Sequence, residues 1–355
     1  MSGNGVLIIG GGLAGWRAAE AAANGGARVT LVSNGVGNSP EIHALNCPVL
    51  PEDSVEQYVE DTLSSGKFEG DRALVETMCC ESLALKDEFR FDGTVIRPLG
   101  SKVPRCVSIN HAIGAIALDA IKKRMQSVVK VEARTVTVAE ILSIRAAEPS
   151  LKIIIATGGW CGKYDFSTNP TYLKGDGLLI AEALGAALRD VDEAHVQYEP
   201  TVRVEGKKRG VPVITTLLYE GARLLNADGR EFLGDARLNK DELSKAIFRE
   251  GGYAFYDLTG VPEEKLRDCR MDLSERVIKV APAPHSSLGG IMIDSKCHAL
   301  DCYGNIVQGV FACGEVTAGI HGLNRLGGNG GTAAMVFGAI AGREAALELK
   351  NEKLK

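Results

Sequence analysis

Short apolar runs alternate with amphipathic stretches along the chain, which predicts strands that alternate with helices. The runs at 6–10 and 151–157 place large aliphatic side chains in succession, a pattern typical of strands buried on both faces of a parallel sheet. Residues 16–23 are predicted to form a helix between the first run and a second strand at 27–32. Residues 332–350 are predicted to form a long helix. The order strand, helix, strand indicates an α/β fold with a Rossmann-like parallel sheet.

The pattern changes between residues 201 and 283, where charge is denser and short strand-like runs such as 211–217 appear. We therefore predict that 1–200 and 284–355 form one domain, and that 201–283 form a small α+β domain inserted into it. A further amphipathic helix is predicted at 72–89, with Cys79 and Cys80 as core residues.

Composition narrows the class of protein. The 355 residues are 45% hydrophobic and 24% charged, as in a globular protein of about two domains. The net charge of −5, without a basic run, argues against a nucleic-acid partner, and no apolar stretch reaches the length of a membrane span. A strand from Val6 leaves no room for a signal peptide. The nine cysteines show no metal or haem motif, and they favour a reducing cytoplasm.

A glycine motif follows the first predicted strand. Gly10, Gly12 and Gly15 form G-x-G-x-x-G between that strand and the first helix. The first glycine permits a tight turn, the second lets the backbone approach a pyrophosphate, and the third lets helix and strand pack closely. The second strand usually ends in an acid that binds ribose hydroxyls, but Ser33 and Asn34 stand there. The motif predicts a dinucleotide site with an altered ribose contact.

Two later segments have similar chemistry. The strand at 151–157 stops at Gly158 and Gly159, and Asp176 stands between two glycines before a helix predicted at 179–188. Taken alone, Asp176 either faces a cofactor or caps that helix, and capping is the favoured interpretation. The segment 313–331 holds seven glycines in nineteen residues and runs into a helix. Such a loop brings free N–H groups to a flat polar ligand, and the arginine within it indicates an anionic group.

Together these motifs resemble the flavoprotein subunits of succinate dehydrogenase and fumarate reductase, a group that includes L-aspartate oxidase. The resemblance rests on GGGLAG at 10–15, IIIATGGWCGKYDFSTNP at 153–170 and GVFACGEVTAGIHGLNRLGGN at 309–329. SNGVGNS at 33–39 and VEDTL at 59–63 look most like the L-aspartate oxidase branch. The resemblance implies an FAD-binding domain and a capping domain that closes over the flavin. Compared with the family, the capping domain is short and the C-terminal helical domain is missing.

The resemblance also implies how FAD is bound. It places Ser33 near the adenosine ribose, Glu315 on the ribityl chain, and the helix start at Asn329 beside the pyrimidine edge of the flavin. The FAD-binding residues that it implies are Gly10, Gly12, Leu13, Ala14, Gly15, Ser33, Ser39, Thr157, Gly158, Gly159, Asp176, Gly314, Glu315, Asn329, Gly330 and Gly331. In membrane-bound members a histidine links FAD covalently. Pro40 takes that position and His43 does not match it, which predicts noncovalent FAD.

Two residues match the family's substrate site. The family histidine that precedes two glycines corresponds to His285, and the arginine of H-G-x-N-R corresponds to Arg325, with spacing that fits without insertion. Arg325 can hold a carboxylate with two hydrogen bonds, and His285 can donate another. The alternatives are a core histidine for His285 and a structural ion pair for Arg325.

Other positions depart from the family. Glu199 replaces a histidine that binds substrate, and Lys240 replaces an arginine that donates the proton in fumarate reductase. Arg237 takes that role if the alignment slips by three. A separate alternative is that Lys240 is simply a solvated residue of a helix. A carboxylate at Glu199 repels a dicarboxylate unless it is protonated or paired. An acid there suits a substrate with an amine, or one with less negative charge.

These observations predict an FAD-dependent oxidoreductase that transfers hydride between flavin N5 and a small carboxylate substrate of the fumarate, succinate or L-aspartate type. The alternative is an electron-transfer or structural flavoprotein subunit of a larger redox complex, with a degenerate substrate site. In either case a redox partner protein is possible. The acceptor, the direction of reaction and the oligomeric state are open at this point.

Overall fold

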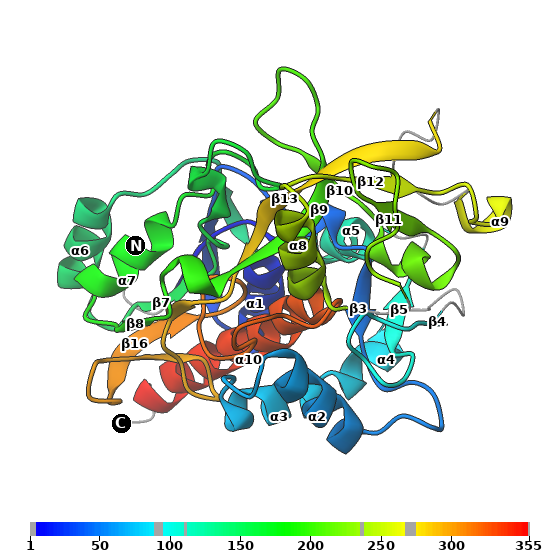
Figure 1. Ribbon diagram of the computed structural model, residues 1–355. Helices are drawn as coiled ribbons and strands as arrows, with labels where there is room; N and C mark the ends of the chain where they lie inside the picture. The colour runs from blue at the N-terminus through cyan, green and yellow to red at the C-terminus, as the bar shows by residue number, and fades with distance from the viewer. Residues whose placement is uncertain (1–4, 89–94, 110–111, 235–237, 267–274, 354–355) are drawn as a thin grey trace.

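The computed structural model describes residues 5–88, 95–109, 112–234, 238–266 and 275–353 (Figure 1). Its first sheet has six strands in the order β15-β16-β7-β1-β2-β6, and only the β15–β16 pair is antiparallel. The predicted Rossmann-like parallel sheet is therefore confirmed. The strands are β1 (Gly5–Ile9), β2 (Arg28–Val32), β6 (Lys130–Glu132), β7 (Lys152–Ile155), β15 (His298–Leu300) and β16 (Ile306–Ala312).

Two helices pack along each other against this sheet, α1 (Leu13–Asn24) and α10 (Asn329–Glu352) (Figure 1). Their close approach depends on glycine, because a Cβ at Gly342 would lie 2.2 Å from the backbone oxygen of Ala18. Helix α1 starts three residues earlier than predicted, since Gly12 is its N-cap. Helix α5 (Ile113–Met125) also packs on α1, and α6 (Val138–Ala147) packs on α7 (Asp176–Ala183).

Two predicted helices have different ends in the structure. Helix α7 stops at Ala183 because Gly185 takes the left-handed conformation, with φ +94°. Leu188, predicted to end the helix, lies instead in strand β8 (Leu188–Arg189), which pairs with β14 (Gly290–Ile291). The helix predicted at 72–89 is two helices, α3 (Arg72–Glu81) and α4 (Leu83–Glu88), and Phe89 lies outside the described residues.

Of the two cysteines predicted in the core, Cys79 is buried but Cys80 is exposed. The prediction for Cys80 was wrong because adjacent residues of a helix point about 100° apart, so one side faces solvent. The cysteines that the structure describes carry free thiols. In the described residues no helix is long and apolar enough to cross a membrane.

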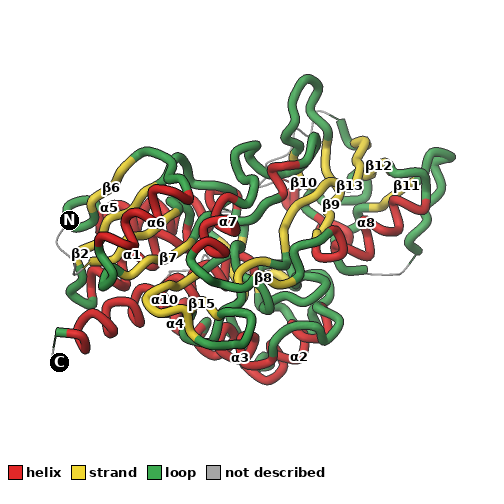
Figure 2. Tube along the Cα trace, turned by 90° about the vertical axis from the view of Figure 1, so that its left-hand side faces the viewer, coloured by secondary structure: helices red, strands yellow, loops and turns green. Residues whose placement is uncertain are grey.

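A second, antiparallel sheet stands beside the first, in the order β10-β9-β13-β12-β11 (Figure 2). It has its own hydrophobic cluster, which includes Leu224, Ile247 and Tyr256. Its strands are β9 (Val196–Val202), β10 (Val211–Pro212), β11 (Arg223–Leu225), β12 (Ala254–Asp257) and β13 (Val277–Ser287). Helices α8 (Lys240–Arg249) and α9 (Glu263–Leu266) accompany it. The predicted boundaries at 200 and 283 fall inside β9 and β13, two neighbouring strands of this sheet.

A smaller group of elements buttresses the start of α10. It comprises a sheet of β3 (Ala44–Asn46), β5 (Cys106–Ser108) and β4 (Val95–Ile96), with α2 (Val55–Ser65) alongside. Arg105 is fully buried at the centre of this group. Its guanidinium lies 2.8 Å from Asp53 and 3.0 Å from Asp61, and stacks on the ring of Tyr58. These contacts fix the loop before α2 to the small sheet.

Candidate active site

A cavity with a volume of about 660 Å³ lies between the two main sheets. Residues that follow the carboxyl ends of four parallel strands line it, as expected for a ligand site of an open α/β sheet: Gly10 after β1, Ser33 after β2, Thr157 after β7 and Gly314 after β16. The cavity extends to the second sheet, where Glu199 and His285 also line it.

Most of the predicted FAD-binding residues line this cavity. They are Gly10, Gly12, Leu13, Ala14, Ser33, Ser39, Thr157, Gly158, Asp176, Gly314, Glu315, Gly330 and Gly331. Gly15, Gly159 and Asn329 do not. These three residues lie behind the cavity wall, and each one makes room for, or positions, a residue that lines the cavity.

The glycines of the first motif act through close backbone contacts. Gly10 has φ +122°, and a Cβ there would lie 2.1 Å from the oxygen of Ala156 on the neighbouring strand. A Cβ at Gly15 would lie 2.0 Å from the oxygen of Gly10, so Gly15 lets α1 approach β1. A Cβ at Gly12 would meet the hydroxyl of Ser39 at 2.9 Å. Gly10 and Gly15 therefore permit the close backbone packing that shapes this turn, and Gly12 leaves room beside the Ser39 hydroxyl at the cavity wall.

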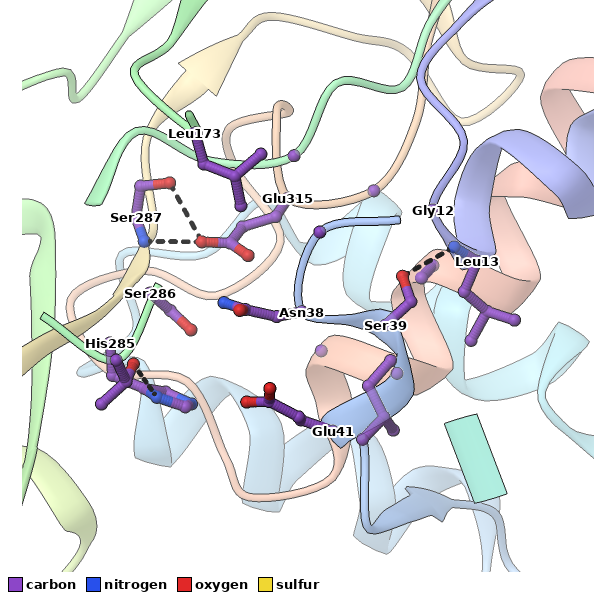
Figure 3. Close-up of a pocket in the computed structure, with 18 of the residues that line it drawn as sticks. Gly12, Leu13, Asn38, Ser39, Glu41, Leu173, His285, Ser286, Ser287 and Glu315 are labelled. Atoms are coloured by element: carbon purple, nitrogen blue, oxygen red, sulfur yellow. Dashed lines mark hydrogen bonds between the residues drawn. The ribbon is translucent and has the colours of Figure 1, made fainter. Parts of the chain in front are cut away.

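Three hydroxyl groups at the cavity differ in the hydrogen bonds that they make. Ser39 accepts the N–H of Leu13 at 2.7 Å, which satisfies the first free donor of α1 (Figure 3). Ser33 donates to the carbonyl of Gly35 at 2.6 Å and must reorient to donate to a ribose. The Thr157 hydroxyl is buried without a hydrogen-bond partner. A buried unpaired donor carries a free-energy cost, so Thr157 fits a residue that awaits a ligand.

Glu315 is held at the cavity wall by Ser287, whose N–H and hydroxyl lie 3.0 Å and 3.3 Å from its Oε1 (Figure 3). Burial raises the pKa of the Glu315 carboxyl. A Cβ at Gly159 would lie 2.3 Å from the same oxygen. Gly159 therefore makes room for the Glu315 carboxylate and does not contact the cavity itself.

Asn329 anchors the start of α10. Its side-chain oxygen accepts from Asn46 at 2.6 Å and from the Tyr58 hydroxyl at 2.7 Å, and its amide donates to Thr62 at 3.1 Å. Asn329 is fully buried, so its side chain positions the helix while the next two residues line the cavity. The unpaired N–H groups of this first turn suit the edge of a flavin that becomes negatively charged.

Asp176 is the first residue of α7 and is exposed at the cavity wall. The N-cap of α7 is Gly175, with φ +91°, and no side chain caps this helix. The interpretation of Asp176 as a capping residue was therefore wrong. Its charge still interacts favourably with the helix N-terminus.

The structure brings together the four predicted catalytic residues around one atom, Oε1 of Glu199. Lys240 Nζ lies 2.7 Å from it, His285 Nε2 lies 3.2 Å from it, and Arg325 Nη2 lies 3.7 Å from it. Glu199 is only 1% exposed. The alternative that Lys240 is a solvated helix residue is wrong, since its side chain is mostly buried and lines the cavity. Arg237 lies outside the described residues.

The charges in this cluster are set by burial and by neighbouring groups. Burial alone would raise the pKa of Glu199, but His285, Lys240 and Arg325 lower it to about 2. Burial lowers the pKa of His285 to about 3, with Lys240 and Arg325 acting in the same direction. The ring is therefore neutral at neutral pH, and Lys240 and Arg325 are the cations that keep Glu199 ionised.

Neighbouring groups orient His285 and Arg325. The Nδ1 atom of His285 lies 2.8 Å from the Thr168 hydroxyl, and Asn169 donates to the His285 carbonyl at 2.8 Å (Figure 3). The Arg325 carbonyl accepts from Gln197 at 2.9 Å. The Nε atom of Arg325 is buried without a hydrogen-bond partner. A guanidinium with an unpaired donor in a cavity suits an anionic ligand.

Sequence reasoning missed His321 and Thr168. His321 lines the cavity, its Nδ1 is buried without a partner, and burial followed by the charge of Arg325 lowers its pKa to about 3. It is the first residue of the H-G-x-N-R motif, so the motif itself could have pointed to it. Thr168 gives no signal in the sequence, because its role depends on its distance from His285.

Comparison with known proteins places this site in a family. The profile of the FAD binding domain family matches residues 5–105 and 115–330. The chain is 30% identical to a fumarate reductase (CoM/CoB) subunit from Methanothermobacter marburgensis, over 96% of this chain and 72% of that protein. It is 27% identical to L-aspartate oxidase of Pyrococcus horikoshii, over 99% of this chain and 78% of that protein.

Solved structures agree on the fold. E. coli quinol fumarate reductase superposes with a TM-score of 0.80 at 23% identity, over 98% of this chain and 71% of that one. A flavocytochrome c3 fumarate reductase gives a TM-score of 0.73 at 24% identity, over 98% of this chain and 78% of that one.

The fold and the glycine-lined cavity define a flavoprotein with an FAD-binding domain. More particularly, the chain belongs to the FAD-binding family of fumarate reductase and L-aspartate oxidase, and it is an FAD-dependent oxidoreductase. The close backbone approaches at Gly10 and Gly15 and the unpaired Thr157 hydroxyl fit this cofactor. The family, fold and cofactor predicted from the sequence are confirmed.

Proposed function

We propose that this chain transfers hydride between N5 of FAD and a carbon of a small carboxylate substrate, of the fumarate, succinate or L-aspartate type. The observation that carries the proposal is Arg325, a largely buried arginine whose buried Nε has no hydrogen-bond partner, in the same cavity as the FAD-binding glycines. Bound FAD accepts or supplies the hydride. The protein must then hold the substrate, exclude water and move a proton.

Each residue of the cluster has a proposed role. Arg325 holds the substrate carboxylate, and neutral His285 offers a further hydrogen bond to it, which stabilises charge that develops in the transition state. Lys240 Nζ carries the proton to or from a substrate carbon. The separate hydrophobic cluster at Leu224, Ile247 and Tyr256 supports a capping domain at 201–283 that closes over the flavin.

The same cavity supports the proposed contacts to FAD. The turn at Gly10 and Gly12 and the start of α1 hold the pyrophosphate, while Thr157, which follows the neighbouring strand β7, donates a hydrogen bond to the cofactor. The first turn of α10, at Gly330 and Gly331, places N–H groups at the pyrimidine edge of the flavin and stabilises negative charge there. Glu315 accepts hydrogen bonds from hydroxyl groups of the ribityl chain.

A panel of small acids tests the proposed function. Succinate, butyrate or L-aspartate is expected to bleach the oxidised flavin under anaerobic conditions, and fumarate or crotonate is expected to reoxidise the reduced flavin. With at least one acid, the flavin absorbance should change faster than it does in the same protein without any added acid. If none of the five acids changes the flavin absorbance, the proposal of hydride transfer between FAD and a carboxylate substrate of this size is contradicted.

We predict that FAD is bound noncovalently, because Pro40 stands where some family members carry the linking histidine. Precipitation with acid is expected to release all flavin into the supernatant and to leave a colourless pellet. The control is the flavin absorbance of the intact protein, which the supernatant must match. A washed pellet that stays yellow would show a covalent link, with His43 as the first residue to replace.

A second candidate is an electron-transfer or structural component of a redox complex. It is favoured by Glu199, whose carboxylate already occupies the cations that a substrate would need. It is also favoured by the relative from Methanothermobacter marburgensis, whose name describes it as one subunit of an enzyme. Co-purification with an iron–sulfur protein, together with no response to the acid panel, would support this candidate.

A further inference from the structure

The cluster around Glu199 has a charge balance that distinguishes between classes of carboxylate. Resting on the proposed hydride transfer, we infer that the substrate is a small monocarboxylate, with an apolar group where fumarate, succinate and L-aspartate carry a second carboxylate. Glu199 excludes that second carboxylate. This makes Glu199 a specificity-determining residue of the site.

The groups available to bind anions are already arranged around an internal anion. Lys240 Nζ lies 2.7 Å from Oε1 of Glu199, which leaves Arg325, at 3.7 Å, as the weaker contact. His285 adds no charge, because its ring is neutral at neutral pH. With two cations and one carboxylate, the cluster has a net charge of about +1, which one substrate carboxylate neutralises.

Glu199 cannot readily leave this position. It lies in the middle of β9, where its backbone pairs with Ala283 of β13, and it is 1% exposed. Gln197, two residues earlier on the same strand, points to the same side and bonds the Arg325 carbonyl at 2.9 Å. Displacing Glu199 by a substrate carboxylate would leave a buried charge unpaired, which is strongly unfavourable.

Arg325 is the group that remains for a ligand. Its Nε is buried without a partner, and its Nη2 makes only a 3.3 Å contact with Ser286 in addition to the distant Glu199. A planar guanidinium can bind one carboxylate with two hydrogen bonds. A second carboxylate on the same small substrate would lie close to Glu199 and be repelled.

The other end of the substrate meets different surroundings. Both Pro98 Cβ and the Lys240 Cε carbon lie within 4 Å of the position that a Cβ would take at Gly327. An apolar side chain and the lysine stem thus share this wall, which suits a methyl group better than a carboxylate. An ammonium group is also disfavoured, because Glu199 is already neutralised by Lys240, whose like charge would repel an amine.

Two pairs of acids of matched shape test the inference. Butyrate and succinate serve for binding, followed by the change in flavin absorbance, and crotonate and fumarate serve for turnover. The wild-type holoenzyme is expected to bind butyrate at least tenfold more tightly than succinate. Glu199→Gln is expected to shift this ratio at least tenfold toward succinate, because Lys240 becomes available to a second carboxylate. Glu199→His, which restores the family residue, should shift it in the same direction.

Glu242→Gln is the matched control. Glu242 lies on α8, two residues from Lys240, but pairs with Lys67 at the surface, so this variant removes one negative charge without altering the cluster. Its binding ratio should equal that of the wild type. Flavin content and the thermal unfolding midpoint establish that each variant is folded.

The outcomes separate this inference from the proposed function. An unchanged ratio in both Glu199 variants overturns the inference, as does equal binding of the two acids, or no binding of either, by the wild type. If butyrate binds and the ratio shifts but no acid is turned over, the specificity stands and hydride transfer fails. If acids are turned over but the ratio does not shift, hydride transfer stands and the role of Glu199 fails.

Discussion

Replacing Arg325 by methionine is expected to lower kcat/KM for the best acid of the panel by roughly 10²- to 10⁴-fold. Truncating one partner of a buried, hydrogen-bonded charge pair costs about 2–5 kcal/mol of binding free energy, and each factor of ten in rate corresponds to about 1.4 kcal/mol. Methionine keeps much of the apolar stem but removes both the charge and the planar hydrogen-bonding fork. The measurement is steady-state kinetics with the flavin content held equal.

Two further variants identify the cause of this loss. Arg325→Lys keeps the charge but not the fork, so it should recover part of the rate and remain at least tenfold below the wild type. Arg343→Met is the control, because Arg343 is an exposed arginine of α10 that lies 3.7 Å from Glu81, away from the cavity. Full activity in Arg325→Met would show that the substrate carboxylate binds elsewhere.

The parallel sheet could be predicted because its signal is local. The strand from Gly5 to Ile9 is buried at every position, so its side chains had to be apolar without alternation. The glycine motif could be predicted for a related reason, since a Cβ at Gly10 would lie 2.1 Å, and one at Gly15 2.0 Å, from a backbone oxygen. Only glycine fits at such positions, and the requirement is therefore visible in the sequence as a glycine motif.

Element ends were harder to predict, because the competing structures have similar local patterns. Apolar residues continue through Leu184 and Leu188, which resembles a longer helix. The left-handed Gly185 ends the helix, and pairing with β14 makes Leu188 part of a strand. The split at Ser82 is similar, since Ser82 is buried and bonds the carbonyl of Cys79 at 2.7 Å.

The sequence motifs identified individual residues of the site, but they did not predict which of these residues contact each other. Glu199 and Lys240 were each recognised as departures from the family, with no indication that they touch. Their contact exists because α8 packs on β9 and brings Nζ to within 2.7 Å of Oε1. Asn329 shows the reverse case, where a motif residue expected at the flavin is turned away from it by Asn46 and Tyr58.

The second large effect is expected at Lys240. Lys240→Met should reduce turnover of the best acid by roughly 10²- to 10⁴-fold, the usual contribution of a general acid or base. Lys240 is the first residue of α8, where a positive charge opposes the helix dipole. A residue that is locally unfavourable but turned into the cavity indicates a functional reason for its position. Lys240→Arg should retain more activity than Lys240→Met, since arginine keeps a positive charge beside Glu199.

A double variant separates proton transfer from charge balance. Lys240→Met alone leaves the buried Glu199 without its nearest cation, and this defect could itself disturb the site. In Lys240→Met with Glu199→Gln, no carboxylate is left unpaired. If Lys240 carries the proton, the double variant stays as slow as Lys240→Met; if Lys240 only neutralises Glu199, the double variant recovers. Reaction of the reduced flavin with dioxygen needs no proton at a substrate carbon, so its rate should be equal in all these variants.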